Sequence, residues 1–101
     1  MNRETRSLTD IVVVVLDGDT DAGQRLAQRL LAEGRRVAAI ARHPGAAVAI
    51  IHGHSADRVM LIAADTADER QWSQVVERVT RRFGRVDSVV RAGDATLRAS
   101  A

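Results

Sequence analysis

Three carboxylates stand close together in one loop of this chain, at Asp17, Asp19 and Asp21. The loop follows a continuous apolar run at 11–16 and precedes a segment whose apolar residues repeat at helical spacing. Dinucleotide-binding proteins place a glycine-rich loop between such a strand and helix, because bare backbone lets a pyrophosphate reach the helix N-terminus. Here Gly18 and Gly23 stand among the three carboxylates. The pattern therefore indicates a nucleotide-binding scaffold whose anion site has been altered.

The three carboxylates have three interpretations. The first is structural: aspartate favours turns, and Asp21 or Thr20 can cap the following helix, placing a built-in anion where a phosphate otherwise binds. The second is a calcium loop, because Asp-x-Asp-x-Asp supplies oxygen ligands, although Gln28 replaces the usual bidentate Glu. The third is an aspartyl nucleophile, because an apolar strand followed by Asp17-Gly-Asp-Thr faintly resembles haloacid-dehalogenase phosphatases.

Few other side chains outside this loop have the spacing of a reactive site. His52 and His54 flank Gly53, but two histidines without a third ligand are more often loop residues, so no metal site is predicted. Trp72 and Phe83 lie on one helical stripe, which favours a place in the core or an interface over a stacking platform.

The elements that must position these residues alternate along the chain. Strands are predicted at 11–16, 37–41, 59–63 and 86–90, and helices at 21–33, 44–51 and 68–83. Residues that start and end helices support this division, since Asp68 is a suitable N-cap and a glycine follows each of the three helices, at Gly34, Gly53 and Gly84. The order β-α-β-α-β-α-β with short connections implies a parallel sheet with right-handed crossovers. Residues 1–10 are expected to be disordered or frayed, and residues 94–101 to form a tail.

Composition narrows the class of protein. The chain has 101 residues, enough for one domain, and 46% of them are apolar, although it has no Tyr and only one Phe and one Trp. The absence of Cys excludes disulfides and thiol chemistry. All 15 basic residues are Arg and are spread along the chain against 13 acids, so no nucleic-acid surface is expected. Without a long apolar run or a signal-type N-terminus, no membrane association and a cytoplasmic location are expected.

Several spaced segments resemble the N-terminal half of the short-chain dehydrogenase/reductase family. Residues 23–37 match the family's first helix and the start of its second strand, and 39–42 match the end of that strand. Residues 64–68 match its D-V-T-D segment, and 83–93 match its F-G-x-[IV]-D turn with the following N-N-A-G strand end. The resemblance implies an α/β, Rossmann-like parallel sheet of about four strands in the order 3-2-1-4, with helices on both faces. It covers residues 11–93, which we predict to be a half domain.

Departures from the family pattern fall at its functional motifs. The T-G-x-x-x-G-x-G loop aligns with Leu16, Asp17, Asp21 and Gly23, so two of its three glycines are Asp, with Gly18 partly standing in for the first. Where the family has the two asparagines of N-N-A-G, this chain has the single residue Arg91. The family's catalytic Tyr-x-x-x-Lys cannot occur in a chain with neither Tyr nor Lys. The resemblance therefore implies no catalytic residue here and no working reductase from this chain alone.

The resemblance also names candidate cofactor-binding residues. They share the positions where the family meets its dinucleotide, and they are Gly18, Gly23, Arg42, Asp65, Ala92 and Gly93. Arg42 follows the second strand, where an Arg can pair with the 2′-phosphate of NADP. Asp65 takes the place that meets the adenine ring in the family, and its alternative is a turn residue before the next helix. The expected cofactor is none, or weakly bound NADP(H).

Two functions follow from this reading. The leading hypothesis is a non-catalytic interaction or regulatory subunit, and the alternative is a residual NADP(H)-binding module completed by another chain; a decayed gene product is a third reading. The last strand is apolar and is expected at an open edge, and one sheet face is expected to be thinly covered over 37–40 and 59–62. The expected partner is therefore a second copy or a larger dehydrogenase-like protein.

Overall fold

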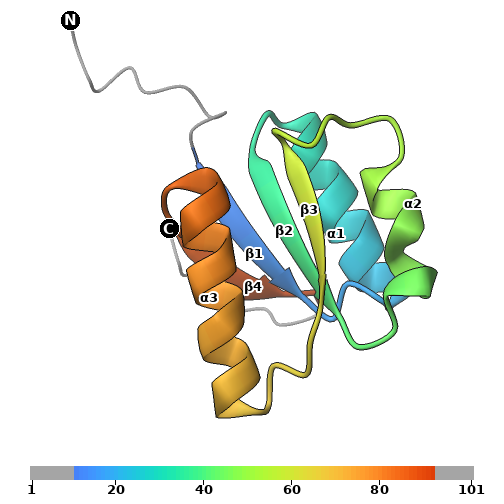
Figure 1. Ribbon diagram of the computed structural model, residues 1–101. Coiled ribbons are helices and arrows are strands. Elements are labelled where there is room, and N and C mark those ends of the chain that lie inside the picture. Colours follow the sequence, from blue (N-terminus) through green and yellow to red (C-terminus); the bar gives the residue numbers. More distant parts are fainter. Residues whose placement is uncertain (1–10, 93–101) are drawn as a thin grey trace, which may run out of the picture.

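Four parallel strands form a single sheet in the computed structural model, which describes residues 11–92 (Figure 1). They are β1 (Val12–Leu16), β2 (Arg36–Ala41), β3 (Val59–Ala63) and β4 (Ser88–Arg91), in the order β3-β2-β1-β4. The register places Val14 beside Ala38 on one side and beside Val89 on the other. The predicted strand order and parallel pairing are therefore confirmed.

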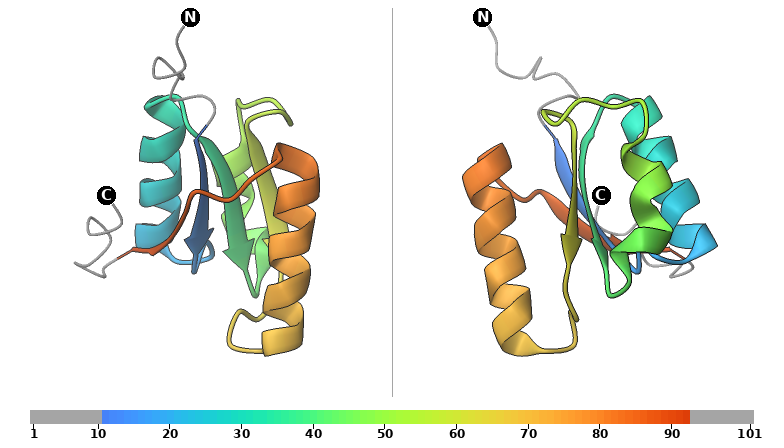
Figure 2. Two further views of the ribbon diagram at one scale, coloured as in Figure 1. Left: turned by 90° about the vertical axis from the view of Figure 1, so that its left-hand side faces the viewer. Right: turned by 45° about the vertical axis from the view of Figure 1, so that its right-hand side comes forward.

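Helices cover both faces of the sheet, as expected (Figures 1 and 2). On one face, α1 (Asp21–Ala32), the 3₁₀ turn η3 (Pro44–Ala47) and the short α2 (Val48–Ile51) pack against a core that includes Val15, Ala39 and Leu31. On the other face, α3 (Glu69–Phe83) packs Val75, Val79 and Phe83 against β1, β2 and β3. The small side chains of the sheet let these helices approach closely, which suits a core with so few aromatic residues.

Local signals in the sequence fix the helix ends. The Asp68 carboxylate accepts hydrogen bonds from the amides of Arg70 and Gln71 and so caps α3, as predicted. Gly84 ends that helix with a φ of 89°, and Gly34 follows α1 with a φ of 95°, a conformation that favours glycine. The predicted 44–51 helix is instead a 3₁₀ turn followed by one α-helical turn, because no side chain caps it at His43 and Gly45 is a weak helix former.

Two expectations for the sheet need correction. Residues 86–90 were expected to form the last strand, but β4 starts at Ser88, while Val86 packs beside α3 as part of the approach to the strand. The sheet face over 37–40 and 59–62 is not thinly covered, because α3 buries Ala38, Ile40 and Ile62. The exposed apolar position on that face is Val89 of β4, at 41% exposure, because α3 lies over the other strands.

The predictions for residues 1–10 and 94–101 lie outside the described residues, and the 11–93 domain boundary stays a prediction. Between residues 11 and 92, no helix is both long enough and apolar enough to span a membrane.

Candidate functional site

The carboxyl ends of all four strands meet at one edge of the sheet, where the candidate residues were predicted. Gly18 and Gly23 follow β1, Arg42 follows β2, Asp65 follows β3 and Ala92 follows β4. The crossover direction reverses between β1 and β4, since the chain moves outward through β2 and β3 and then returns to the other side of β1. Ligands of open α/β sheets bind at such a reversal point. The predicted residues therefore share the correct edge of the fold.

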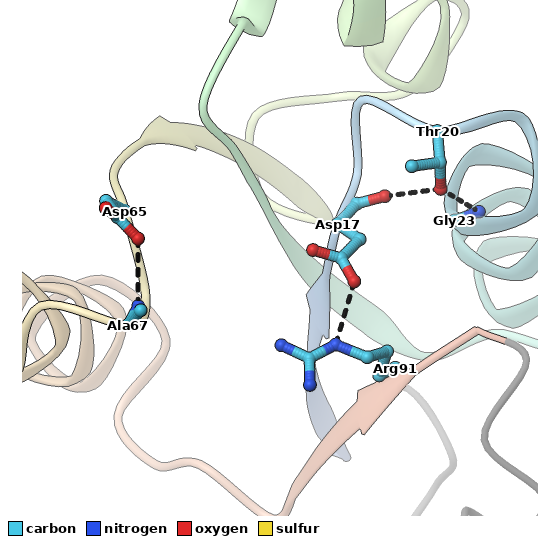
Figure 3. Close-up of polar contacts among 6 residues, drawn as sticks. All are labelled: Asp17, Thr20, Gly23, Asp65, Ala67 and Arg91. Carbon is cyan, nitrogen blue, oxygen red and sulfur yellow. Dashed lines mark hydrogen bonds and ion pairs between the residues drawn. The ribbon is translucent and has the colours of Figure 1, made fainter.

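The loop after β1 is a tight turn held by Thr20 (Figure 3). Its hydroxyl donates to the carbonyl oxygen of Asp17 at 2.8 Å and accepts from the amide of Gly23 at 3.0 Å. The Thr20 amide also donates to the Asp17 carbonyl, at 3.1 Å. Asp17 has a φ of 56°, a left-handed conformation that Asp tolerates better than most residues. Thr20 is thus the N-cap of α1 and joins the turn to the helix.

Packing alone requires a glycine at position 23 and favours one at position 18. A Cβ at Gly23 would lie 2.1 Å from the Asp17 carbonyl oxygen, which is far inside van der Waals contact. Gly18 donates its amide to the Ile40 carbonyl at 2.8 Å, and a Cβ there would lie 3.2 Å from the same oxygen. The loop therefore keeps its glycines for close backbone approach between β1, α1 and β2, whether or not a phosphate binds.

An ion pair joins the ends of β1 and β4 at the reversal point. The Nε of Arg91 donates to Oδ2 of Asp17 at 2.8 Å (Figure 3). Both side chains are about half exposed, at 49% for Arg91 and 46% for Asp17. The pair neutralises one of the three loop carboxylates and places two side chains across the carboxyl ends of β1 and β4.

The other two carboxylates have separate roles. Asp19 Oδ2 accepts the backbone amide of His43 at 3.1 Å and so connects the loop to the end of β2. Asp21 is exposed in the first turn of α1, where the helix dipole favours an anion. The capping interpretation is confirmed with the Thr20 hydroxyl as the cap, and the built-in anion comes from Asp21 beside it.

The arrangement of these carboxylates gives no support to a metal site. Asp17 and Asp19 point to different partners, Arg91 and the His43 amide, rather than to a common centre. Within residues 11–92, no three His, Asp or Glu side chains gather in a way that could hold a metal ion.

The remaining candidates lie farther from the loop. Arg42 is exposed directly after β2. Asp65 forms an Asx turn, in which its Oδ1 accepts a hydrogen bond from the amide of Ala67 at 3.0 Å, so its interpretation as a turn residue is confirmed. Figure 3 shows Asp65 well apart from Asp17. Ala92 is partly buried just after β4, and Gly93 lies outside the described residues.

Sequence reasoning missed two polar contacts at this edge. One is the Arg91 side chain, whose partner Asp17 is 74 residues away in the chain. The other is Gln24, whose amide nitrogen donates to the Ala46 carbonyl at 2.6 Å and ties α1 to η3. The only sequence signal for the first contact was a charge of opposite sign at the end of each of two strands, which becomes informative once β1 and β4 are known to be neighbours.

Chemically, this edge favours cations over anions beside α1. A phosphate at the α1 N-terminus would meet the Asp21 carboxylate and would have to displace or bypass the Asp17–Arg91 pair. Farther out, the exposed guanidinium of Arg42 offers an anion contact after β2. The site thus keeps the strand order and the two loop glycines of a dinucleotide-binding edge, with an unfavourable charge at the N-terminus of α1.

Comparisons with known proteins agree with this geometry. A sequence model described as short-chain dehydrogenase matches residues 11–98. A search of curated proteins finds no match.

Solved structures of similar fold are longer than this chain. A short-chain dehydrogenase from Bacillus anthracis superposes with a TM-score of 0.78 at 19% identity, over 87% of this chain and 36% of that one. A 3-ketoacyl-(acyl-carrier-protein) reductase from Brucella melitensis, complexed with NADH, has a TM-score of 0.73 and 25% identity over 82% of this chain and 34% of its own. Levodione reductase has a TM-score of 0.69 and 31% identity over 83% and 34%. The chain therefore spans about a third of the length of each.

Proposed function

Because the chain belongs to the short-chain dehydrogenase family, we propose that it acts as a non-catalytic interaction subunit that associates along the outer edge of β4. The observation that carries this proposal is Val89, which is 41% exposed on a strand that pairs only with β1 among the described residues. An apolar edge strand with open backbone groups is a typical association site. The proposed setting is the cytoplasm.

The hydrogen-bond pattern supports β4 as a template for strand addition. The Arg36 amide donates to the Ile11 carbonyl at 2.9 Å, so the odd-numbered residues of β1 bond to β2 and its even-numbered residues bond to β4. Because the register places Val14 beside Val89, Ser88 and Val90 bond to β1, whereas Val89 and Arg91 direct their backbone groups outward. A strand from another molecule can pair with these outward groups and cover Val89.

A second copy of this chain is one partner that fits, since two β4 edges related by a twofold axis pair as antiparallel strands. A larger dehydrogenase-like protein is the other. In either form the subunit supplies no proton-transfer pair, because these 101 residues contain neither Tyr nor Lys. The side chains of the loop after β1 already form internal contacts, since Asp17 pairs with Arg91 and Thr20 caps α1. These contacts support a structural rather than a chemical role for the subunit.

Sedimentation of two matched variants tests the association. The wild-type chain, of 10.9 kDa, is expected to sediment above monomer mass. Val89→Arg should return it to a monomer, since a charge on the covered face has to be desolvated. Val48→Arg is the control, because Val48 is exposed to a similar extent, at 48%, but lies on α2. A wild type that stays a well-folded monomer at about 1 mM, where even weak self-association is visible, contradicts the proposal.

The alternative is a residual NADP(H)-binding module, and the exposed Arg42 after β2 favours it. Calorimetric titration of NADPH separates the two functions, with micromolar binding supporting the module and no binding up to about 1 mM supporting the interaction subunit. Asp17→Gly with Asp21→Gly should raise the affinity for NADPH if carboxylate repulsion is the obstacle. If the affinity does not rise in a variant that remains folded, the shape of the site, and not only its charge, prevents NADPH from binding.

A further inference from the structure

A cationic groove follows the outer edge of β3, on the opposite side of the sheet from β4. Figure 2 shows this edge between α3 and α2, with no further strand beside it in the part of the chain that the structure describes. The largest hollow of the groove has a volume of about 480 Å³. Its lining combines apolar and cationic side chains, which include Ile51, Leu61, Met60, Arg78 and Arg82.

The groove extends along the strand through two adjoining hollows. One is lined by Met60, Arg78, Arg81 and Arg82, and the other reaches Ala63 and Gln74 at the carboxyl end of β3. No Asp or Glu lines any of the three hollows. The charge along this edge is therefore of one sign.

Two of the three groove arginines, Arg78 and Arg82, form no ion pair with a carboxylate within residues 11–92. Arg81 pairs with Glu77 at 3.0 Å. Arg82 donates to the carbonyl oxygen of Ala56 at 2.6 Å, which holds its guanidinium over the loop before β3. Arg78 and Arg82 are one helical turn apart on α3, so both stand beside the strand.

Backbone groups of β3 are available along the same edge. The Val37 amide donates to the Arg58 carbonyl and the Ala64 amide to the Ala41 carbonyl, which sets the alternation of the β2–β3 ladder. Residues 58, 60, 62 and 64 therefore bond to β2, and Leu61 and Ala63 direct their amides and carbonyls outward. Val59 directs its amide outward too, but that amide donates to the Ser55 carbonyl at 3.3 Å.

We propose that the outer edge of β3 binds an extended acidic segment of a partner protein as an added strand. Successive side chains of a strand point to opposite faces. One set of the segment's side chains then faces Arg78 and Arg82 on the α3 side, and the other faces Ile51 and Leu61 on the α2 side. The matching segment alternates acidic and apolar residues. This site goes beyond the proposed function and uses neither β4 nor the loop after β1.

Fluorescence anisotropy with a defined probe tests the site. The probe is a fluorescein-labelled peptide of about eight residues, a common strand length, with alternating Glu and Val. We expect a Kd of about 100 µM or tighter. A peptide with Lys in place of Glu should bind at least about tenfold more weakly, since it opposes the arginines. A Glu-Val peptide N-methylated at alternate amides should also lose binding, since it cannot complete the ladder.

Matched charge reversals locate the site on the protein. Arg78→Glu with Arg82→Glu should weaken binding about tenfold or more. Arg25→Glu with Arg29→Glu makes the same charge change at the same spacing on the exposed side of α1 and should leave binding unchanged. Hydrogen exchange of the Leu61 and Ala63 amides should slow when the peptide is bound.

Three results would each overturn the proposal: no binding of the Glu-Val peptide up to about 1 mM, equal loss in both double variants, or unchanged exchange at Leu61 and Ala63. Val89→Arg should leave peptide binding intact. Failure at β3 is therefore distinguishable from failure of the β4 interface.

Discussion

Replacing Gly23 with alanine should destabilise this fold by about 3 kcal/mol. The new Cβ would lie 2.1 Å from the Asp17 carbonyl oxygen and 3.1 Å from Thr20 Oγ1. The first of these is a backbone atom, and it already accepts hydrogen bonds from the amide and hydroxyl of Thr20. Relieving the clash means moving that carbonyl, which adds about 1 kcal/mol for a weakened hydrogen bond to the 1–3 kcal/mol typical of overpacking, giving about 3 kcal/mol.

Urea denaturation followed by circular dichroism measures this loss. With a slope of about 1.5 kcal/mol per molar urea, the midpoint should fall by about 2 M. Gly45→Ala is the control, because nothing lies within 4 Å of a Cβ at that position. If Gly23→Ala lowers the free energy of unfolding by less than about 0.5 kcal/mol relative to this control, the normal range for surface changes, the packing explanation for Gly23 is refuted.

Three further predictions concern polar contacts around the sheet. Thr20→Ala should cost about 1 kcal/mol in urea denaturation because α1 loses its cap, whereas Thr20→Ser should cost little; equal losses would point to the methyl group instead. A double-mutant cycle of Asp17→Asn and Arg91→Met should give a coupling below about 1 kcal/mol that falls with salt, because the pair is exposed; a larger, salt-insensitive coupling contradicts this. Asp68→Ala should cost about 1 kcal/mol by removing the cap of α3, and no loss would mean that α3 does not depend on it.

Features that depend on neighbouring residues were predictable from the sequence. The apolar run at 11–16 predicted β1, and the Asp68 cap and Gly84 predicted the ends of α3, because these signals act over a few residues. The parallel order was predictable because short alternating elements leave few ways to connect a sheet. The predicted helix at 44–51 was only partly correct, since Gly45 and the missing cap weaken it.

Features that depend on tertiary placement were not predictable. The Asp17–Arg91 pair requires the β1–β4 register, which aligns Leu16 with Arg91. The cover of Ala38 and Ile40 by α3 depends on the path of that helix across the sheet, which the spacing of Val75 and Val79 cannot give. The expectation of thin cover over 37–40 and 59–62 was therefore wrong, and the exposed apolar residue on that face is Val89 of β4.

The contact between Asp87 and Val12 has a consequence for the order of folding. The Val12 amide donates to Asp87 Oδ2 at 2.8 Å across 75 residues of chain, so β1, at the centre of the sheet, receives its second neighbour from the far end of the sequence. Closing so long a loop carries a larger entropic penalty than pairing β1 with β2. During synthesis the edge of β1 that pairs with β4 therefore stays unpaired until β4 has been made. In the folded monomer β4 should be the first strand to detach, and its amides the first of the sheet to exchange with solvent.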